Sequence, residues 1–382
     1  MNQEKKTSIL IFSTAYLPLI GGAEIAIKNI TDRISEYDFL LITTRLRKDL
    51  KKRERVGNVD VIRVGTGFWP FFDKICSPFL GAFVARRLMK ERNIKLFWCM
   101  MVTFTSGAPF LLKILRLNKK IPILLTLQEG DPESHLKYSN FALSGLSWIL
   151  AMCFADYIQA ISVYLKDFAI RMGAKVRIEV IPNGVDIGLI RPRAIKSEKK
   201  KKIITTSRLV EKNGIDTLIE AVSIVKNKIP DIQCWIIGGG EKEDELKKLT
   251  AEHKVTENIV FFGEVLPNEI YNYLTSADVF VRASRSEGLG NSFLEAMGAN
   301  LPIIGTPVGG IPDFLKDGET GLFVRPDDPQ DLAGKIILLL EDSDLYEKIS
   351  KNGRDLVVDH YSWESVSRSM LRIFKILEEA QI

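Results

Sequence analysis

One short stretch of the chain contains two glutamates and two glycines, and the types and spacing of these residues suit a ligand-binding or catalytic site. Glu287 stands in a turn with Gly288 and Gly290, and Glu295 follows eight residues after Glu287. A glycine turn at the start of a helix offers free N–H groups and a positive dipole end, which bind anions such as phosphate. Carboxylates instead accept hydrogen bonds from neutral hydroxyls, such as those of ribose or a sugar ring. The stretch therefore predicts a nucleotide-sugar site; a surface turn with both glutamates in water is the alternative.

A short strand and a helix must position these residues. The apolar run Asp278–Val281 predicts a buried strand before the turn. Phe293, Leu294 and Met297 recur at helical spacing, so we expect a helix from about residue 291, capped by Asn291 or Ser292. The glycine turn would then lie at the carboxyl end of the strand and the amino end of the helix.

Two further segments have features suited to a phosphate. Arg208 follows the predicted strand 203–207, and Lys212 lies in the next turn, so both cations could neutralise a diphosphate. Gly21 and Gly22 join the predicted strand 8–12 to a helix, which again gives a strand–turn–helix geometry. This turn lacks G-x-G-x-x-G, and a plain tight turn is the alternative.

The glutamate pair lies in a longer run that resembles a known family. Its setting, E-G-L-G-N-S-F-L-E-A-M, resembles the donor-site signature of the retaining glycosyltransferases of family 4, the glycosyl transferases group 1, which have the GT-B fold. The runs 301–313 and 317–324 match the same family. The resemblance covers nearly the whole chain, is strongest over residues 181–330 and is weakest over residues 45–120.

The resemblance implies roles for individual residues. Glu295 would bind the ribose, and Glu287 would bind the donor sugar and act in catalysis with Arg208 and Lys212. The other donor-binding positions implied are Gly21, Gly22, Gly288, Leu289, Gly290 and Asn291. One departure is that Lys212 stands one place early, because Asn213 lies between it and Gly214.

A second departure concerns the vicinity of the acceptor and the reacting sugar. Gln128 and Glu129 follow the predicted strand 121–126 where the family often has His-Asp or His-Glu. Glutamine can hydrogen-bond a sugar hydroxyl but cannot titrate, so no general base is assigned. His135 lies downstream, and nothing in the sequence places it at the site.

Strands alternate with helices in both halves of the chain, which predicts an α/β fold with parallel sheets built of βαβ units. The resemblance implies a GT-B arrangement, in which two Rossmann-like doubly wound domains face a central cleft. We expect an acceptor domain over residues 1–187, completed by a C-terminal helix over 364–382, and a donor domain over 188–363. A charged linker, 191–202, would mark the boundary.

Composition limits the other functions open to the chain. The four cysteines are scattered and the three histidines are far apart, so we expect neither disulfides nor a metal site. We see no leader segment and no membrane-spanning run, and no nucleic-acid motif. We therefore expect a cytoplasmic protein without a cofactor, whose nucleoside diphosphate sugar is a co-substrate.

The first half of the chain carries features of a membrane-contacting surface. Its net charge is +10 against −5 for residues 191–382, and 45–55 is a basic run. The aromatic cluster 68–72 and the apolar residues after it precede a basic segment, 86–92. These features predict peripheral contact with an anionic membrane. A solvated loop and an ordinary core helix are the alternatives.

We expect a metal-independent hexosyltransferase that acts with retention on a glycolipid or cell-envelope polysaccharide precursor. A non-catalytic nucleotide-sugar-binding or membrane scaffold is one alternative, and a GT-B nucleotide-sugar epimerase is another. The carboxylate pair also resembles that of a glycoside hydrolase, but a hydrolase would not need adjacent phosphate-binding features.

Overall fold

The chain divides into two compact units in the computed structural model, which describes residues 6–118, 120–131, 143–190 and 201–380. Unit 1 comprises Met1–Asn183 and Trp363–Ile382, and unit 2 comprises Gly184–Ser362. The sequence analysis expected the boundaries after residue 187 and before residue 364, whereas these units divide after Asn183 and before Trp363. His135 and residues 191–200 of the predicted linker lie outside the described residues.

A largely parallel sheet forms the centre of unit 1. Within the described residues it has eight strands in the order β3-β4-β2-β1-β5-β6-β7-β8, and only the β3–β4 pairing is antiparallel. The strands are β1 (Ser8–Phe12), β2 (Asp38–Thr44), β3 (Arg53–Val56), β4 (Val59–Val64), β5 (Ile94–Met100), β6 (Ile123–Leu127), β7 (Tyr157–Ala160) and β8 (Ile178–Val180). The central strands read as continuous apolar runs because helices cover both faces of the sheet.

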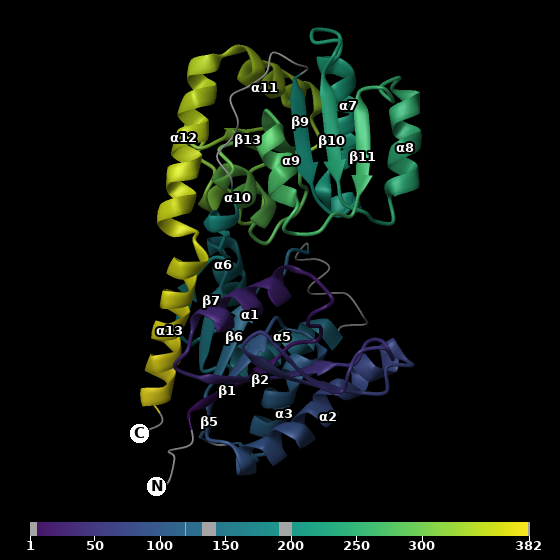
Figure 1. Ribbon diagram of the computed structural model, residues 1–382. Helices are drawn as coiled ribbons and strands as arrows, with labels where there is room; N and C mark the ends of the chain where they lie inside the picture. The colour runs from purple at the N-terminus through teal and green to yellow at the C-terminus, as the bar shows by residue number, and fades with distance from the viewer. Residues whose placement is uncertain (1–5, 119, 132–142, 191–200, 381–382) are drawn as a thin grey trace. The chain divides into compact units, whose positions relative to one another are not determined.

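Neighbouring residues of β2 show which helices cover which face. Leu41 joins the core that α1 and α13 complete, whereas Ile42 points to the opposite face, towards Gly81 of α2. The helices α2 and α3 lie side by side on that second face (Figure 1). The helices of unit 1 are α1 (Gly22–Arg33), α2 (Pro70–Glu91), α3 (Gly107–Ile114), α5 (Leu143–Phe154), α6 (Val163–Arg171) and α13 (Trp363–Glu379).

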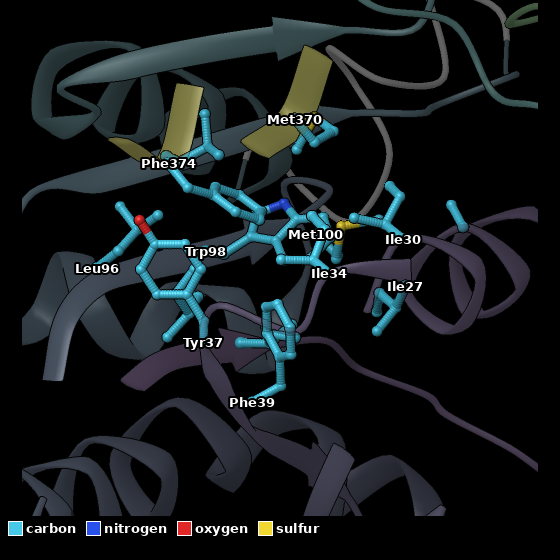
Figure 2. Packing of buried hydrophobic residues seen from close by; sticks show 14 of the residues in the cluster. Ile27, Ile30, Ile34, Tyr37, Phe39, Leu96, Trp98, Met100, Met370 and Phe374 are labelled. Carbon is cyan, nitrogen blue, oxygen red and sulfur yellow. The ribbon is translucent and has the colours of Figure 1, made fainter. Parts of the chain in front are cut away.

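The C-terminal helix α13 is part of the core of unit 1. Its Phe374 packs against Trp98 of β5 and lies at ring-centroid distances of 6.1 Å from Tyr37 and 6.4 Å from Phe39 (Figure 2). Met370 of the same helix is fully buried in this cluster. A segment some 180 residues away from the rest of the unit in sequence therefore closes its hydrophobic core.

The basic run 45–55 is more ordered than a solvated loop. Arg45 donates hydrogen bonds to the carbonyl oxygens of Lys48, Leu50 and Thr66, which fold the segment back on itself. Its last residues form the edge strand β3, paired with β4. The sequence analysis did not predict this hairpin, because its charged residues hide the alternation of an edge strand.

A second, fully parallel sheet forms the centre of unit 2. In the described part of the unit it has six strands, in the order β11-β10-β9-β12-β13-β14. The strands are β9 (Lys202–Thr206), β10 (Gln233–Ile237), β11 (Ile259–Gly263), β12 (Val279–Arg282), β13 (Ile303–Gly305) and β14 (Leu322–Phe323). The helices are α7 (Ile215–Val225), α8 (Glu243–Glu252), α9 (Ile270–Ser276), α10 (Asn291–Gly298), α11 (Pro329–Glu341) and α12 (Ser343–His360).

Strand β12 contributes apolar side chains to the packing on both faces of the unit 2 sheet. Val279 and Val281 belong to the cluster that α7 and α11 cover, whereas Phe280 contacts Phe293 of α10 with ring centroids 5.1 Å apart. The helix after β12 therefore packs on the opposite face from α7. In parallel sheets of this kind, ligands bind beyond the carboxyl ends of the strands, where the predicted donor residues of unit 2 lie.

No helix in the described ranges is both long and apolar enough to cross a membrane.

Candidate functional site

Arg282 is the last residue of β12 and lies at the centre of the polar cluster in unit 2. Side chains alternate along a strand, so Arg282 points to the same face as Phe280, towards α10. It is 9% exposed. A guanidinium at this depth needs polar partners on several sides, because an unpaired buried charge is costly.

Three partners surround the Arg282 guanidinium. Nη1 donates to Ser292 Oγ at 2.7 Å, and Nη2 donates to Asn213 Oδ1 at 2.8 Å. Nη2 also lies 2.7 Å from Glu287 Oε2, a charge pair whose N–H is not aligned for a hydrogen bond. Both side chains of this pair are largely buried, at 10% and 15% exposure. Arg282 thus holds the turn glutamate beside the first turn of α10.

Asn213 connects this cluster to the predicted phosphate-binding cations. Its Nδ2 donates to the carbonyl oxygen of Arg208 at 2.6 Å. The backbone N–H of Arg285 donates to the carbonyl oxygen of Lys212 at 2.7 Å. The loop after β9 and the loop after β12 are therefore joined at two points. The extra residue before Gly214, which the sequence showed only as a departure from the family pattern, is the buried bridge between the loops.

The predicted cations occupy the rim of the cluster. Arg208 is exposed and Lys212 is partly exposed, so both could reach an anion beyond the end of β9. Arg285 lies between two carboxylates, because it donates to Asp216 and Asp327 at 2.7 Å each, and these carboxylates raise the pKa of its guanidinium. Arg285 therefore serves to hold the loops together.

Helix α10 begins where the sequence predicted, but its cap is different. Gly290 is the N-cap, with φ +94°, and no side chain caps the helix. The prediction that Asn291 or Ser292 caps it is wrong, because Arg282 engages the Ser292 hydroxyl and the cap position falls on the glycine. The residues 288–290 are buried. The turn therefore stays compact, as a cradle for a phosphate requires.

The loop after β13 supports the turn from behind. Gly309 has φ +56°, and a Cβ there would lie 1.7 Å from the carbonyl oxygen of Glu287. Only glycine fits this approach, since the contact is with backbone that cannot swing away. The run 301–313, which carried part of the resemblance, therefore fixes the position of Glu287.

Glu295 lies one turn into α10, on the side that faces Arg282. Desolvation raises the pKa of its carboxyl group to about 7, although the Arg282 charge acts in the opposite direction. Its charge in turn helps to raise the pKa of the buried Tyr271 hydroxyl, so the two side chains are neighbours. Glu295 is a partly buried carboxyl group that can accept or donate a hydrogen bond near neutral pH.

The predicted residues of unit 1 form two separate groups. Gly21 is the extended N-cap of α1, and Gly22 is the first residue of that helix. Gln128 and Glu129 follow β6 instead. Gln128 pairs with Asn183 through their amides at 2.9 Å, so its side chain is held in place.

Glu129 is buried at the carboxyl end of β6. Its carboxylate accepts the backbone N–H of Val102 at 2.7 Å and the backbone N–H of Gln128 at 2.9 Å. Burial raises its pKa to about 7 despite these hydrogen bonds. The carboxyl group therefore ties the ends of β5 and β6 together.

The structure brings most of the predicted donor residues together in unit 2. Arg208, Lys212, Glu287, the turn 288–291 and Glu295 all lie around the Arg282–Asn213 connection. The sequence analysis missed Arg282 and gave Asn183 no role. The predicted strand stopped at Val281, and counting one residue further along its alternation would have placed Arg282 towards α10.

Chemically, the unit 2 cluster combines exposed cations, a glycine-capped helix start and two carboxyl groups. The first two favour a phosphate, and the carboxyl groups favour hydroxyls. Within the described ranges, no group of three or more His, Cys, Asp or Glu side chains is arranged to hold a metal ion.

Comparisons with known proteins point to one family. Residues 186–356 match the family model described as glycosyl transferases group 1, and residues 20–189 match that of glycosyltransferase family 4. A GDP-mannose-dependent alpha-(1-6)-phosphatidylinositol monomannoside mannosyltransferase of Mycobacterium tuberculosis is 30% identical over 56% of this chain. That match spans 60% of the relative's length. A GDP-mannose-dependent monoacylated alpha-(1-6)-phosphatidylinositol monomannoside mannosyltransferase of Corynebacterium glutamicum is 26% identical over 98% of this chain and 99% of its own length.

Solved structures share the fold over nearly the whole chain. Sucrose-phosphate synthase from Thermosynechococcus elongatus aligns with a TM-score of 0.83 at 20% identity, over 98% of this chain and 100% of its own. Anabaena HepE, solved with UDP and glucose, aligns with a TM-score of 0.76 at 18% identity, over 96% of this chain and 99% of its own. These likenesses confirm the GT-B fold predicted from the sequence.

Proposed function

This chain belongs to the group 1 glycosyl transferases of glycosyltransferase family 4, and we propose that it transfers a hexosyl group from a nucleoside diphosphate sugar to an acceptor hydroxyl. Family membership confirms the enzyme class predicted from the sequence, a glycosyltransferase. The donor, the acceptor and the stereochemistry are our proposals.

The observation that carries this proposal is the Arg282-centred connection in unit 2. It ties the Arg208–Lys212 loop to Glu287 and to the start of α10. Arg208, Lys212 and the N–H groups after Gly290 would neutralise the diphosphate. The GDP-mannose named for one relative and the UDP-glucose bound in one solved structure of the same fold support a nucleoside diphosphate sugar. Gly21 and Gly22 of unit 1 are further phosphate-binding positions that the family resemblance implies, and we propose them as such.

The two glutamates would hydrogen-bond to hydroxyl groups of the donor. We assign the ribose to Glu295, whose partly buried carboxyl group suits a pair of neutral hydroxyls. Glu287 would bind the donor sugar, with Arg282 stabilising its negative charge. The neighbouring Leu289 is buried and Asn291 is partly exposed, so the backbone of the turn offers the remaining contacts.

We propose that transfer occurs with retention and without a divalent metal. The bond from the anomeric carbon to the diphosphate oxygen breaks, with its electron pair leaving on that oxygen. The acceptor oxygen bonds to the same face of the anomeric carbon, and its proton passes to the departing phosphate. Arg208 and Lys212 would stabilise the charge that develops on the leaving group. No titrating base is needed, which agrees with a glutamine at position 128.

The proposed acceptor is a glycolipid or a cell-envelope polysaccharide precursor. Two relatives are named as phosphatidylinositol mannoside mannosyltransferases, which act on lipid-linked sugars. Gln128 and Glu129 would lie near the reacting sugar and the acceptor. We propose a cytoplasmic location, with peripheral contact at the membrane surface.

A turnover experiment distinguishes this function from its two rivals. The protein is incubated with a UDP-, GDP- or ADP-hexose and an extract of membrane glycolipids, and all products are identified by mass spectrometry and by the proton coupling of the new anomeric centre. A transferase releases nucleoside diphosphate and forms a glycosylated acceptor with the configuration of the donor. Turnover of the donor without acceptor product would indicate an epimerase, and binding without turnover would indicate a scaffold.

A further inference from the structure

Helix α2 and the loop before it expose an unusual set of aromatic side chains. Six of them are between 63% and 75% exposed: Phe68, Trp69, Phe71, Phe72, Phe79 and Phe83. Isolated exposed apolar residues are ordinary, but a contiguous group on one helix marks an interaction site.

The buried side of α2 explains why the rings point outward. Apart from Leu88 in the last turns, the buried residues of α2 are small or polar: Asp73, Ser77, Gly81, Ala82 and Ala85. A Cβ on Gly81 would lie 3.2 Å from the Ala108 side chain, so α2 packs too closely on α3 to admit a ring. The helix is therefore inverted relative to an ordinary surface helix, whose large apolar residues face the core.

Hydrogen bonds fix this display of rings. The Asp73 carboxylate accepts the backbone N–H groups of Thr66 and Gly67 at 2.8 Å each, and these hydrogen bonds lower its pKa. The Ser77 hydroxyl accepts from Thr105 at 2.9 Å. The loop that carries Phe68 and Trp69 is thus anchored to the first turn of α2.

The outward side of α2 changes from aromatic to basic along its length. Phe72, Phe79, Phe83, Arg86 and Lys90 follow one another at intervals that keep them on one side of the helix. Arg87 is paired with Glu91 at 2.7 Å, whereas Arg86 and Lys90 extend the aromatic row as exposed cations. We call the six rings, with Arg86 and Lys90, the α2 face.

We infer that the α2 face docks in the interfacial layer of an anionic lipid bilayer. The rings would enter the boundary between headgroups and acyl chains, and Arg86 and Lys90 would contact lipid phosphates. A second copy of the chain fits less well, because Asp73 is buried and Glu91 is already paired, so the α2 face offers no acidic partner for these two cations. The inference goes beyond the proposed sugar transfer and does not depend on it.

Vesicle flotation tests the inference. The wild type should float with phosphatidylcholine–phosphatidylglycerol vesicles and bind pure phosphatidylcholine far more weakly. Arg86→Gln with Lys90→Gln should lower the partition coefficient about thirtyfold, since each basic residue near an anionic surface contributes about a factor of five. Phe79→Ser with Phe83→Ser should lower it on the order of a hundredfold.

Matched controls come from exposed residues of unit 2. Lys248→Gln with Lys351→Gln removes the same charge, and Leu266→Ser with Val358→Ser removes exposed apolar side chains. Neither pair should change partitioning. An unchanged midpoint of thermal unfolding without ligand shows that each variant is folded. The docking test therefore needs no donor, and its failure is distinguishable from a failure of the proposed function.

A fluorescent label reports whether the α2 face itself enters the lipid. Cys76 is exposed and lies one turn from both Phe72 and Phe79, whereas Cys99 and Cys234 are buried. In a Cys153→Ser background, an environment-sensitive dye on Cys76 should shift to shorter wavelength with anionic vesicles. The same dye on Lys248→Cys, with Cys76 and Cys153 replaced by serine, should not shift. Flotation without a shift at Cys76, no flotation with anionic vesicles, or a lipid-free dimer that Phe79→Ser with Phe83→Ser dissociates would each overturn the inference.

Discussion

Arg282 is the residue on which the unit 2 cluster depends. It is a buried cation with contacts to Ser292, Asn213 and Glu287. Removing one partner of a buried ion pair leaves the other charge buried without compensation. This loss costs more stability than the intact pair contributes. The stability of unit 2 and the position of Glu287 should therefore depend on the same side chain.

Replacing Arg282 by methionine should lower the free energy of unfolding by about 3–5 kcal/mol, because Glu287 is left buried and unpaired. Urea denaturation followed by circular dichroism measures this change. Arg285→Met is the matched control, since that more exposed arginine also bonds two loops and should cost about 1–2 kcal/mol. Equal losses in the two variants would contradict the central position of Arg282.

Glu295 should make stability depend on pH. Its pKa is about 7 in the folded chain against an ordinary value of 4.5. A raised carboxyl pKa contributes stability that is fully present below about pH 4.5 and is lost as the pH rises through 7. Glu295→Gln lacks this loss. The free energy of unfolding of the variant minus that of the wild type should therefore increase by up to about 3 kcal/mol between pH 4.5 and pH 8. Urea unfolding at both pH values measures the difference, and a constant difference would show that the folded-state pKa is not raised.

At the scale of elements, the glycine turn into α10 is held by the loop after β13. The carbonyl oxygen of Glu287 occupies the space where Gly309 would carry a Cβ. The φ values of Gly309 and Gly318 are both positive, at +56° and +69°, but nothing lies within 4 Å of a Cβ at Gly318. An alanine at Gly318 would therefore test backbone strain alone, whereas an alanine at Gly309 would also displace Glu287.

Gly318→Ala should cost about 1 kcal/mol, from the left-handed backbone alone. Gly309→Ala should cost about 3 kcal/mol or more, because Glu287 must also move, and it should abolish donor-induced stabilisation. Thermal unfolding with and without nucleotide sugar measures both effects. Donor stabilisation that survives in Gly309→Ala would mean that the backbone position of Glu287 does not matter for binding.

The sequence analysis predicted most of the secondary-structure elements. It failed where contacts between distant parts of the chain determine the local structure. Runs of mostly apolar residues identified β1, β9 and β12, and Phe293, Leu294 and Met297 identified α10. The edge hairpin β3–β4 was missed because the residues of β3 are mostly charged. The cap of α10 was wrong because the partner of Ser292 is Arg282, ten residues earlier in the chain, and no local pattern shows that contact.

The same division holds for the candidate site. Glu287, Glu295 and the glycines could be named from their spacing and from the resemblance. The bridging roles of Asn213 and Arg282 could not, since they arise only when the loops after β9 and β12 meet. The raised pKa of Glu295 follows from its depth in the fold, which spacing does not show.

At the scale of the whole molecule, the last helix returns to the first unit. Helix α13 follows all of unit 2 in sequence, yet its apolar side lies in the core of unit 1 (Figure 2). The chain therefore enters and leaves unit 2 from the same unit.

Phe374→Ala should lower the free energy of unfolding of unit 1 by about 3–5 kcal/mol, because it leaves a cavity beside Trp98. Hydrogen exchange, read separately for the strands of the two units, measures the loss and should find it in β1, β2 and β5. Phe262→Ala, at a ring that is 36% exposed in unit 2, is the control and should leave exchange in unit 1 unchanged. A loss of protection confined to α13 would contradict its part in that core.

The most direct test of the central claim is thermal stabilisation by a panel of UDP-, GDP- and ADP-sugars. Wild type is compared with Glu295→Ala and with Glu252→Ala, an exposed glutamate on α8 of the same unit. A donor present at about 100 times its dissociation constant should stabilise wild type and Glu252→Ala by roughly 2.7 kcal/mol, and should stabilise Glu295→Ala far less. If no nucleotide sugar stabilises the wild type, or if Glu295→Ala responds equally, the assignment of donor binding to Glu295 is wrong.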